Sequence, residues 1–497
     1  MSKNRETFAS RLGFILVSAG CAVGLGNVWK FPYVCGNNGG AIFILIYLVC
    51  LFALGFPILV CEFAIGRGSG ASIGTALRKL SGGKGRWHQF RWYGLCGNYL
   101  LMMFYTVVAG WMIYYVGVCA KGTLRQANVK EIEQYYQSFM QTPGKMMFFM
   151  LLVVALCIGV CALGLQNGIE NITKKMMLAL IVLMAVMAVN SVMLKGSSKG
   201  LSFYLIPNLE NVKKRGLGNV IFDAMTQAFF TLSVGMGSME IFGSYLGKER
   251  KLTGEAINVL VLDTLIAFVA GIIVIPACIS FGIRPDAGPS LLFITLPNVF
   301  NHMPSGTLWG MLFFVFMSFA ALSTVIAVFE NIISMSMDVF GWERRKALTV
   351  NLVGIAVLSM PTVLGFNVWS GVQLFGPGST IMDVEDFVVS SNILPLGSLL
   401  FVLFCTKKSG WGFERFLEET NTGVGMNFPK FLRRYMRYVL PMIVLVIYFK
   451  GYYDKFKDSS PVIFGVWMMI AIAFAVYILY LSRDKKVKQP LLDGYHR

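Results

Sequence analysis

The chain has 497 residues, of which 56% are hydrophobic and 14% are charged. Because a soluble domain usually carries about 25% charged residues, this composition excludes an ordinary soluble protein and indicates a membrane protein. The net charge of +18 does not indicate nucleic-acid binding, because lysine and arginine mostly flank apolar stretches, as the positive-inside rule describes. We expect the lipid bilayer, and no nucleic acid, as a partner.

Apolar stretches follow one another along the whole chain, and most approach the length of about 20 residues that crosses a bilayer as a helix. In chain order the predicted spans are 12–34, 41–65, 93–118, 146–163, 176–194, 220–246, 256–281, 308–339, 348–364, 387–405, 438–449 and 462–481. The eleventh is short. We therefore predict an all-α polytopic membrane protein with about twelve transmembrane helices.

Basic residues indicate how the spans are oriented. The loop between the second and third spans carries no acid and six basic residues, Arg67, Arg78, Lys79, Lys84, Arg86 and Arg91. The basic stretches 248–251, 343–346 and 407–437 fall on the same side if the spans alternate, whereas the loop 195–215 does not. Because positive loops stay inside, we predict that both termini are cytoplasmic.

The chain shows no pattern that is typical of an enzyme or of a transition-metal site. It has ten cysteines and three histidines, and no pair has metal-ligand spacing beside a histidine. Most of the cysteines fall inside apolar spans, where cysteine behaves as a small hydrophobic residue. We expect neither a disulfide nor zinc, and we expect a protein that is not an enzyme.

Two predicted spans contain glycine-rich interruptions. Residues 18–27 of the first span and 231–238 of the sixth combine glycines with hydroxyl side chains. Each glycine costs a helix about 1 kcal/mol relative to alanine. Either stretch alone is equally compatible with close helix packing. Two interruptions at matched positions, five helices apart, favour a transporter site between two repeats, where freed main-chain groups bind a carboxylate and a cation.

Several motifs are shared with a known family. They are Arg11 to Pro32, Asn38 to Ala41, Glu62 to Arg67, Gln227 to Ser233 and Phe319 to Thr324. From Arg5 to about Cys405 the chain resembles the neurotransmitter:sodium symporters, and in particular their bacterial amino-acid branch. The resemblance implies two inverted five-helix repeats, with helices 1 and 6 unwound in mid-membrane. The implied segments are 1–10, repeats at 11–194 and 195–406, helices 11 and 12 at 407–482, and a cytoplasmic tail at 483–497.

The resemblance also implies two co-transported sodium ions. The first site would use the main-chain oxygen of Ala22 and the side chains of Asn27, Thr231 and Asp263. The second would use main-chain oxygens of Gly20, Val23 and Ala320 and the hydroxyls of Ser323 and Thr324. All of these are oxygen ligands, which a hard cation requires. Several relatives have asparagine where Asp263 stands, so Asp263 could supply the negative charge that chloride supplies in animal members.

The implied substrate is an amino acid. Its carboxylate would meet the N–H groups of Leu25 and Gly26 and the Tyr105 hydroxyl, and its amino group would meet carbonyls near Ala22 and Phe230. The implied binding residues are Ala22, Leu25, Gly26, Leu101, Tyr105, Phe230, Thr231, Ser233, Met236, Thr324 and Val328. Relatives often have phenylalanine where Met236 stands, and asparagine where Cys21 stands. Because methionine is deformable, we predict a pocket for a bulky apolar or aromatic amino acid.

Charged residues near the ends of the site are implied to form gates. Lys30 and Asp386 would pair on the outer side, above a lid of Tyr105 and Phe230, with Asp383 as a rival partner. Arg5 and Asp338 would pair on the cytoplasmic side, near Tyr245 and Glu330. Glu62 would either bond the freed main chain of the helix breaks or pair near Arg67.

The predicted function is sodium-coupled symport of a neutral amino acid by alternating access, independent of chloride. The alternative is a transporter-like amino-acid sensor or receptor. A location in the bacterial plasma membrane follows from the family branch. The sequence does not decide whether the chain forms a homodimer.

Overall fold

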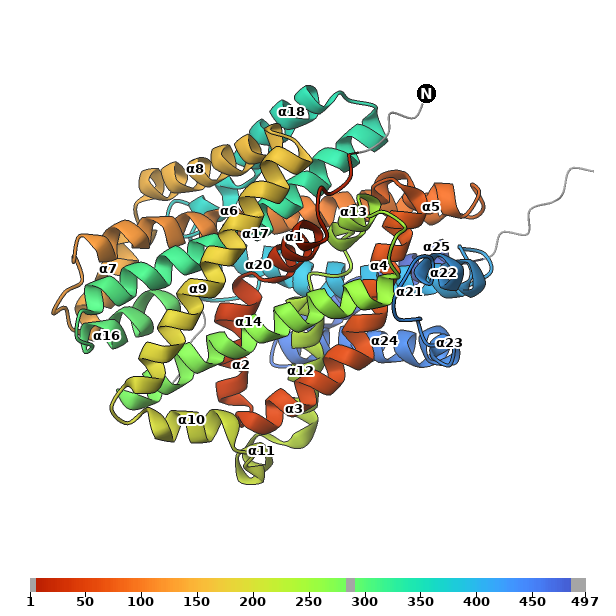
Figure 1. The fold of residues 1–497 in the computed structure, drawn as a ribbon. Coiled ribbons are helices and arrows are strands. Elements are labelled where there is room, and N and C mark those ends of the chain that lie inside the picture. The colour runs from red at the N-terminus through yellow and green to blue at the C-terminus, as the bar shows by residue number, and fades with distance from the viewer. Residues whose placement is uncertain (1–5, 283–290, 484–497) are drawn as a thin grey trace, which may run out of the picture.

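The computed structural model describes residues 6–282 and 291–483, and this part of the chain is almost wholly helical (Figure 1). The first half contains α1 (Arg11–Ala22), η1 (Gly26–Lys30), α2 (Phe31–Asn37), α3 (Ala41–Cys50), η2 (Leu51–Gly55), α4 (Phe56–Ser69), α5 (Ile73–Leu80), η3 (Trp87–Gln89), α6 (Phe90–Ala120), α7 (Val129–Met140), α8 (Pro143–Ala162), η4 (Leu165–Glu170) and α9 (Asn171–Met193).

The second half repeats this alternation of long and short helices. It contains α10 (Ser197–Leu205), α11 (Leu209–Arg215), α12 (Leu217–Thr231), α13 (Ser238–Ser244), α14 (Leu252–Ser280), η5 (Leu291–Thr295), α16 (Leu296–Asn301), α17 (Gly306–Phe340), α18 (Arg344–Leu358), α19 (Met360–Leu364), α20 (Ile381–Val388), η6 (Val389–Ile393) and α21 (Leu394–Thr406). The remainder contains α22 (Phe413–Thr420), α23 (Leu432–Arg434), η7 (Tyr435–Val439), α24 (Leu440–Phe456) and α25 (Pro461–Leu481).

Proline explains most of the short π-helical segments. Pro32, Pro57, Pro297, Pro395 and Pro441 each stand two residues after such a segment, η1, η2, η5, η6 and η7 respectively. Proline lacks an N–H group and its ring clashes with the carbonyl one turn earlier. A local widening to the π-helical pattern lets the chain pass this point without ending the helix.

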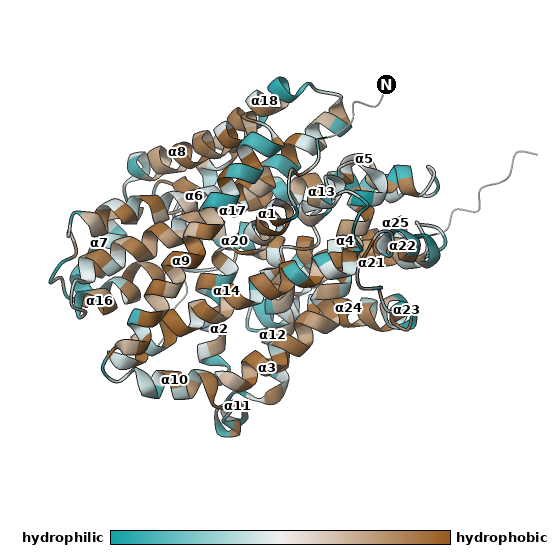
Figure 2. Ribbon diagram, viewed as in Figure 1, coloured by the Kyte–Doolittle hydropathy of each residue, from teal (hydrophilic) through white to brown (hydrophobic). Residues whose placement is uncertain are grey.

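The fold confirms the predicted all-helical membrane protein. Within the described residues, nine helices are long and apolar enough to span a bilayer, and the bent pair of α1 with η1–α2 makes ten. The predicted sixth span is divided between α12 and α13, and the eleventh lies in η7 and α24, which extend well beyond 438–449. Neither the sixth nor the eleventh predicted span is among the helices that are long and apolar enough to cross a bilayer. The count of twelve therefore stays a prediction. Apolar residues run along most long helices, and polar residues gather at ends and connections (Figure 2).

The interrupted helices lie inside the bundle. α1 packs against α9, α14 and α17, and α13 packs against α4. Figure 1 shows α1 near the middle of the view, and most of its residues are buried. Irregular main chain at membrane depth is tolerated only in such protein-lined positions. The core therefore brings both breaks into one interior region.

Candidate functional site

The first span is interrupted between α1 and η1, as predicted. Its two halves meet at 59°. Val23 has an extended conformation, with φ −71° and ψ 96°, so the helical hydrogen-bond ladder stops there and nearby main-chain groups need other partners. The N–H of Leu25 donates to the Tyr105 hydroxyl at 2.9 Å. This break therefore presents main-chain donors to the third span.

The sixth predicted span is interrupted between α12 and α13. Ser233, Gly235 and Gly237 have φ angles of 51°, 104° and 82°, in the left-handed region that side chains disfavour. Gly235 is also fixed by space, because a Cβ atom there would lie 2.2 Å from the carbonyl oxygen of Leu394. The glycines thus allow both the unwound main chain and its close contact with α21.

Glu62, on α4, binds the freed main chain of the second break. Its carboxyl oxygens accept the N–H groups of Gly235 at 2.5 Å and Glu240 at 3.3 Å, and the side chain is buried. The alternative pairing with Arg67 is not formed, because the Arg67 guanidinium pairs with Glu419 at 2.7 Å. A buried carboxylate that accepts main-chain N–H groups stabilises irregular backbone.

The side chains expected at the first sodium site lie together. Nδ2 of Asn27 donates to Oδ1 of Asp263 at 2.7 Å, and Oγ1 of Thr231 donates to Oδ2 at 3.0 Å. All three are fully buried. The Asn27 Oδ1 atom accepts the N–H of Gly24 at 3.4 Å, which ties this cluster to the first break. Ala22, whose carbonyl is the fourth expected ligand, is the last residue of α1.

The five residues expected at the second sodium site also converge. Oγ of Ser323 lies 2.9 Å from the carbonyl oxygens of both Gly20 and Ala320. Oγ1 of Thr324 lies 3.3 Å from those of Gly20, Val23 and Ala320. Two hydroxyls and three carbonyls thus share a small buried volume between α1 and α17. This set of oxygen atoms has the chemistry that a hard cation requires.

Glycines let the neighbouring spans touch the first break. A Cβ atom on Gly24 would lie 2.3 Å from the Tyr105 hydroxyl and 2.9 Å from Oγ1 of Thr324. A Cβ atom on Gly26 would lie 2.7 Å from the Phe230 ring. The Phe230 ring therefore covers one side of the N–H groups that are expected to bind a carboxylate. On the other side these groups lie near Thr324 of the second expected sodium site.

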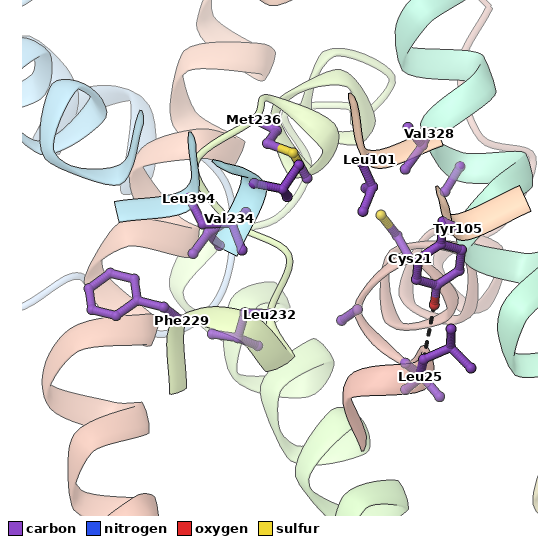
Figure 3. Close-up of a cluster of buried hydrophobic side chains, with 14 of the residues drawn as sticks. Cys21, Leu25, Leu101, Tyr105, Phe229, Leu232, Val234, Met236, Val328 and Leu394 are labelled. Atoms are coloured by element: carbon purple, nitrogen blue, oxygen red, sulfur yellow. Dashed lines mark hydrogen bonds between the residues drawn. The ribbon is translucent and has the colours of Figure 1, made fainter. Parts of the chain in front are cut away.

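The remaining expected substrate residues lie around the breaks. Leu101, Met236 and Val328 are buried, and Figure 3 shows them with Cys21, Tyr105 and the bond from Tyr105 to Leu25. Oγ of Ser233 donates to the Cys21 carbonyl at 3.4 Å. Within the part of the chain described, no group of three or more His, Cys, Asp or Glu side chains is placed to bind a metal.

Sequence reasoning missed three amides that position these elements. Asn98 on α6 and Asn331 on α17 both donate to the Met236 carbonyl, at 3.0 and 3.4 Å. Gln227 donates to the Gly26 carbonyl at 3.1 Å. The signal was present, because an amide inside an apolar span needs a partner. The partners are main-chain atoms of the breaks, which no sequence pattern identifies.

The expected outer gate pair is not formed in this structure. Lys30 and Asp386 line one cavity of about 210 Å³, beside Tyr105 and Phe230. The Lys30 ammonium lies 3.9 Å from the centre of the Phe230 ring, and Asp386 accepts the Ser390 hydroxyl at 2.9 Å. No salt bridge between Lys30 and Asp386 occurs among the described residues. A cation–π contact, which is worth about 0.5–2 kcal/mol, takes the place of the pair.

The rival partner, Asp383, has a local role. Its carboxylate accepts the main-chain N–H and the hydroxyl of Thr380, at 2.7 and 2.9 Å, and so completes a capping box at the start of α20. Such a cap satisfies main-chain donors at a helix N-terminus. Asp383 is thus already engaged at the start of α20.

The expected inner gate is described in part. Arg5 lies outside the described residues, so its pairing with Asp338 stays a prediction. Asp338 accepts the N–H and the hydroxyl of Ser72, at 2.7 and 2.6 Å. Tyr245 donates to Glu330 at 2.7 Å, in keeping with their expected proximity.

Arg344 is a further member of this region that the sequence did not indicate. Its guanidinium binds both carboxyl oxygens of Glu330, at 2.7 and 3.1 Å, and the Cys161 carbonyl at 2.8 Å. A two-point pair of this kind is stronger and more directional than a single contact. It fixes the start of α18 to α17 and to the end of α8.

Comparison with known proteins places the chain among sodium-dependent transporters. A model described as the sodium:neurotransmitter symporter family matches residues 5–135 and 126–483. The uncharacterized sodium-dependent transporter YhdH of Bacillus subtilis (strain 168) is 33% identical over 443 residues, which cover 89% of this chain and 96% of that protein. The uncharacterized transporter MJ1319 of Methanocaldococcus jannaschii is 30% identical over 509 residues, covering 97% and 99%.

A solved structure has the same architecture. The crystal structure of MhsT in complex with L-phenylalanine superimposes with a TM-score of 0.80 and 36% sequence identity, and the match covers 90% of this chain and 100% of MhsT. A sodium- and chloride-dependent GABA transporter 2 from Bos taurus is more distant, at 24% identity over 85% of this chain and 75% of its own.

Proposed function

Because the chain belongs to the sodium:neurotransmitter symporter family, we propose that it imports a neutral amino acid together with sodium by alternating access. One arrangement carries the proposal. The residues of the first and second expected sodium sites, here called the first and second oxygen clusters, meet the N–H group of Leu25 at the break between α1 and η1. Sodium beside a substrate carboxylate strengthens the binding of both, and that mutual effect is the coupling.

The proposed ion number is two, one for each oxygen cluster. An ion that moves down about 100 mV gains about 2.3 kcal/mol, and a tenfold concentration gradient adds about 1.4 kcal/mol. Two ions therefore supply about 7.4 kcal/mol, enough to accumulate a neutral substrate about 10⁵-fold at full coupling. Measuring the membrane potential at which net uptake reverses, at known gradients, would give the stoichiometry.

The proposed substrate is a bulky apolar or aromatic amino acid. Leu101, Met236 and Val328 offer apolar surface, and Met236 can adapt its shape. The related MhsT, whose crystal structure contains L-phenylalanine, supports this class. Competition of unlabelled tryptophan, tyrosine and leucine against a labelled aromatic amino acid tests it. A preference for glycine or glutamate would rule the class out.

Chloride independence is proposed from Asp263. Its carboxylate is fully buried between Asn27 and Thr231, so a fixed negative charge already stands beside the first oxygen cluster. Replacing chloride by gluconate should leave uptake unchanged, and a large loss would refute the proposal.

The proposed orientation places residues 1–10 and 483–497 in the cytoplasm, with repeats at 11–194 and 195–406 and two further helices at 407–482. Asp386 and the cavity beside Lys30 then face outward, whereas Asp338 and Glu330 face inward. Single-cysteine labelling from each side of sealed vesicles, in a background without native reactive cysteines, tests this assignment.

The deciding experiment is uptake of labelled amino acids into proteoliposomes that contain only the purified protein. An inward sodium gradient should produce saturable accumulation, and a potassium gradient or a sodium ionophore should abolish it. Saturable binding without uptake would instead favour a sensor. Uptake that does not respond to sodium would overturn the proposal.

A further inference from the structure

Glu385 is a carboxyl group buried in the outer part of the bundle, apart from both sodium clusters. It lies on α20 and is 5% exposed. Its Oε2 atom accepts the Thr362 hydroxyl at 2.7 Å. Its Oε1 atom has no hydrogen-bond partner among the described residues. A carboxylate with a single neutral donor at this depth is far from satisfied in its ionised form.

None of the salt bridges among the described residues involves Glu385. α20 packs against α6, α19 and η6. α6 has no charged residue after Arg91 at its start, and α19, η6 and the segment 365–380 have none.

Titratable groups also occur on the elements that pack against α20; several have other partners, whereas the Tyr115 hydroxyl has none among the described residues. Tyr105 on α6 accepts the Leu25 N–H, and Tyr114 bonds Tyr135. The other titratable side chains of α6 are Tyr93, Cys96, Tyr99, Tyr115 and Cys119. On α20 itself Asp383 caps the helix and Asp386 binds Ser390.

Two lysines lie near α20, and both contact aromatic rings. Lys30 lies across the 210 Å³ cavity, over the Phe230 ring. α24 packs its aromatic residues against Phe387, and its Lys455 lies over the Phe375 ring. Both ammonium groups are thus engaged with aromatic rings rather than with Glu385.

The Glu385–Thr362 contact is part of a polar seam. One turn before Thr362, the Ser359 hydroxyl lies 3.1 Å from that of Thr106 on α6. Residues three apart on a helix share a face, so Ser359 and Thr362 together join α6 and α20 to this part of the ninth predicted span. The seam holds α20 in place while Asp386, the next residue, lines the cavity.

We propose that Glu385 is a proton-binding site: it carries a proton while α20 is closed on α19, and it releases that proton to the outer solution when α20 moves away. A neutral acid can donate to Thr362 and leaves no buried charge. Glu385 is next in sequence to Asp386, which lines the cavity, so a movement of α20 away from α19 opens a path for water from that cavity to Glu385. The proton then passes to water and the carboxylate is hydrated.

The consequence is an outer gate whose opening depends on external pH. Low pH keeps Glu385 protonated and α20 closed, and therefore slows uptake. One titrating group changes a rate by at most about tenfold for each pH unit. We expect initial uptake rates of the wild type to rise at least about threefold from about pH 6 to about pH 8.

Two variants test the assignment. Glu385→Gln, which is always neutral, should give a slow rate that is nearly the same at both pH values. Thr362→Ser, which keeps the hydroxyl, should keep the wild-type pH profile and serves as the matched control. A flat wild-type profile, or a Glu385→Gln profile like that of the wild type, overturns the proposal.

The uptake test rests on the proposed function, so a second measurement does not use transport. The infrared spectrum of the purified protein at about pH 6 should contain a neutral-acid carbonyl band that Glu385→Gln lacks. Where that variant does not fold, Glu385→Asp should shift the band, because the shorter acid meets Thr362 differently. An unchanged band in the variant shows that Glu385 is ionised and overturns the proposal, whether or not sodium drives uptake.

Discussion

Gly24 is the position at which a single methyl group tests the geometry of the site. Its φ angle is outside the left-handed region, so alanine can adopt the same main-chain conformation and any effect is steric. The added Cβ atom would lie 2.3 Å from the Tyr105 hydroxyl and 2.9 Å from Oγ1 of Thr324. Ordinary contacts begin near 3.4 Å, so Tyr105 has to move by about 1 Å.

The cost follows from what Tyr105 does. Overpacking a tight interior site costs about 1–3 kcal/mol, and losing the bond from the Leu25 N–H costs about 1 kcal/mol more. The sum of about 2–4 kcal/mol predicts that Gly24→Ala binds substrate about 30- to 1,000-fold more weakly at saturating sodium. The displacement also disturbs Thr324, so the sodium concentration for half-saturation should rise.

The assay is equilibrium binding of a labelled substrate to purified protein, with thermal unfolding measured on the same sample. Gly117→Ala is the matched control, because Gly117 lies on the helix that carries Tyr105 and a Cβ atom there has no neighbour within 4 Å. The control should bind normally. Wild-type affinity in Gly24→Ala, or an equal loss in both variants, would refute the reasoning.

Three further substitutions probe the rest of the site. Thr324→Val keeps the shape but removes an oxygen of the second cluster, so sodium titrations should show at least about tenfold weaker half-saturation. Asp263→Asn removes the fixed charge, so uptake should fall strongly and part of it should return when chloride replaces gluconate; a variant indifferent to chloride contradicts the assigned role. Glu62→Gln should lower the free energy of unfolding by about 1.5–3 kcal/mol, measured in detergent, because the Gly235 N–H loses a charged acceptor.

The sequence predicted the two breaks from local chemistry, whereas the residues of the two oxygen clusters were expected from the family resemblance. Glycines beside hydroxyl side chains in an apolar span indicate unwound main chain, and the structure places Ser323 and Thr324 against the carbonyls of Gly20 and Val23. Once the spans are assigned, the packing of α1 against α17 explains why these hydroxyls and carbonyls lie close together. The short eleventh stretch was underestimated, because η7 begins before the apolar run and α24 continues into charged residues.

Charged contacts could not be predicted in the same way. Lys30 has a long, flexible side chain, and a cation near both a carboxylate and an aromatic ring can choose either. Its position over Phe230 depends on how far α20 stands from η1, which is a tertiary distance. Arg344 follows from no motif for the same reason, since its partner Glu330 lies on a different helix.

The first break explains why sodium, substrate and lid act on one another. Three glycines in one short stretch each admit a different span: Gly20 approaches Ser323, Gly24 approaches Tyr105, and Gly26 approaches the Phe230 ring. A shift of a few tenths of an ångström in this stretch therefore changes an ion cluster, a carboxylate contact and the lid together, because close-packed contacts do not deform independently. Under the proposed function, the coupling of sodium to substrate therefore depends on the close contacts that Gly20, Gly24 and Gly26 allow.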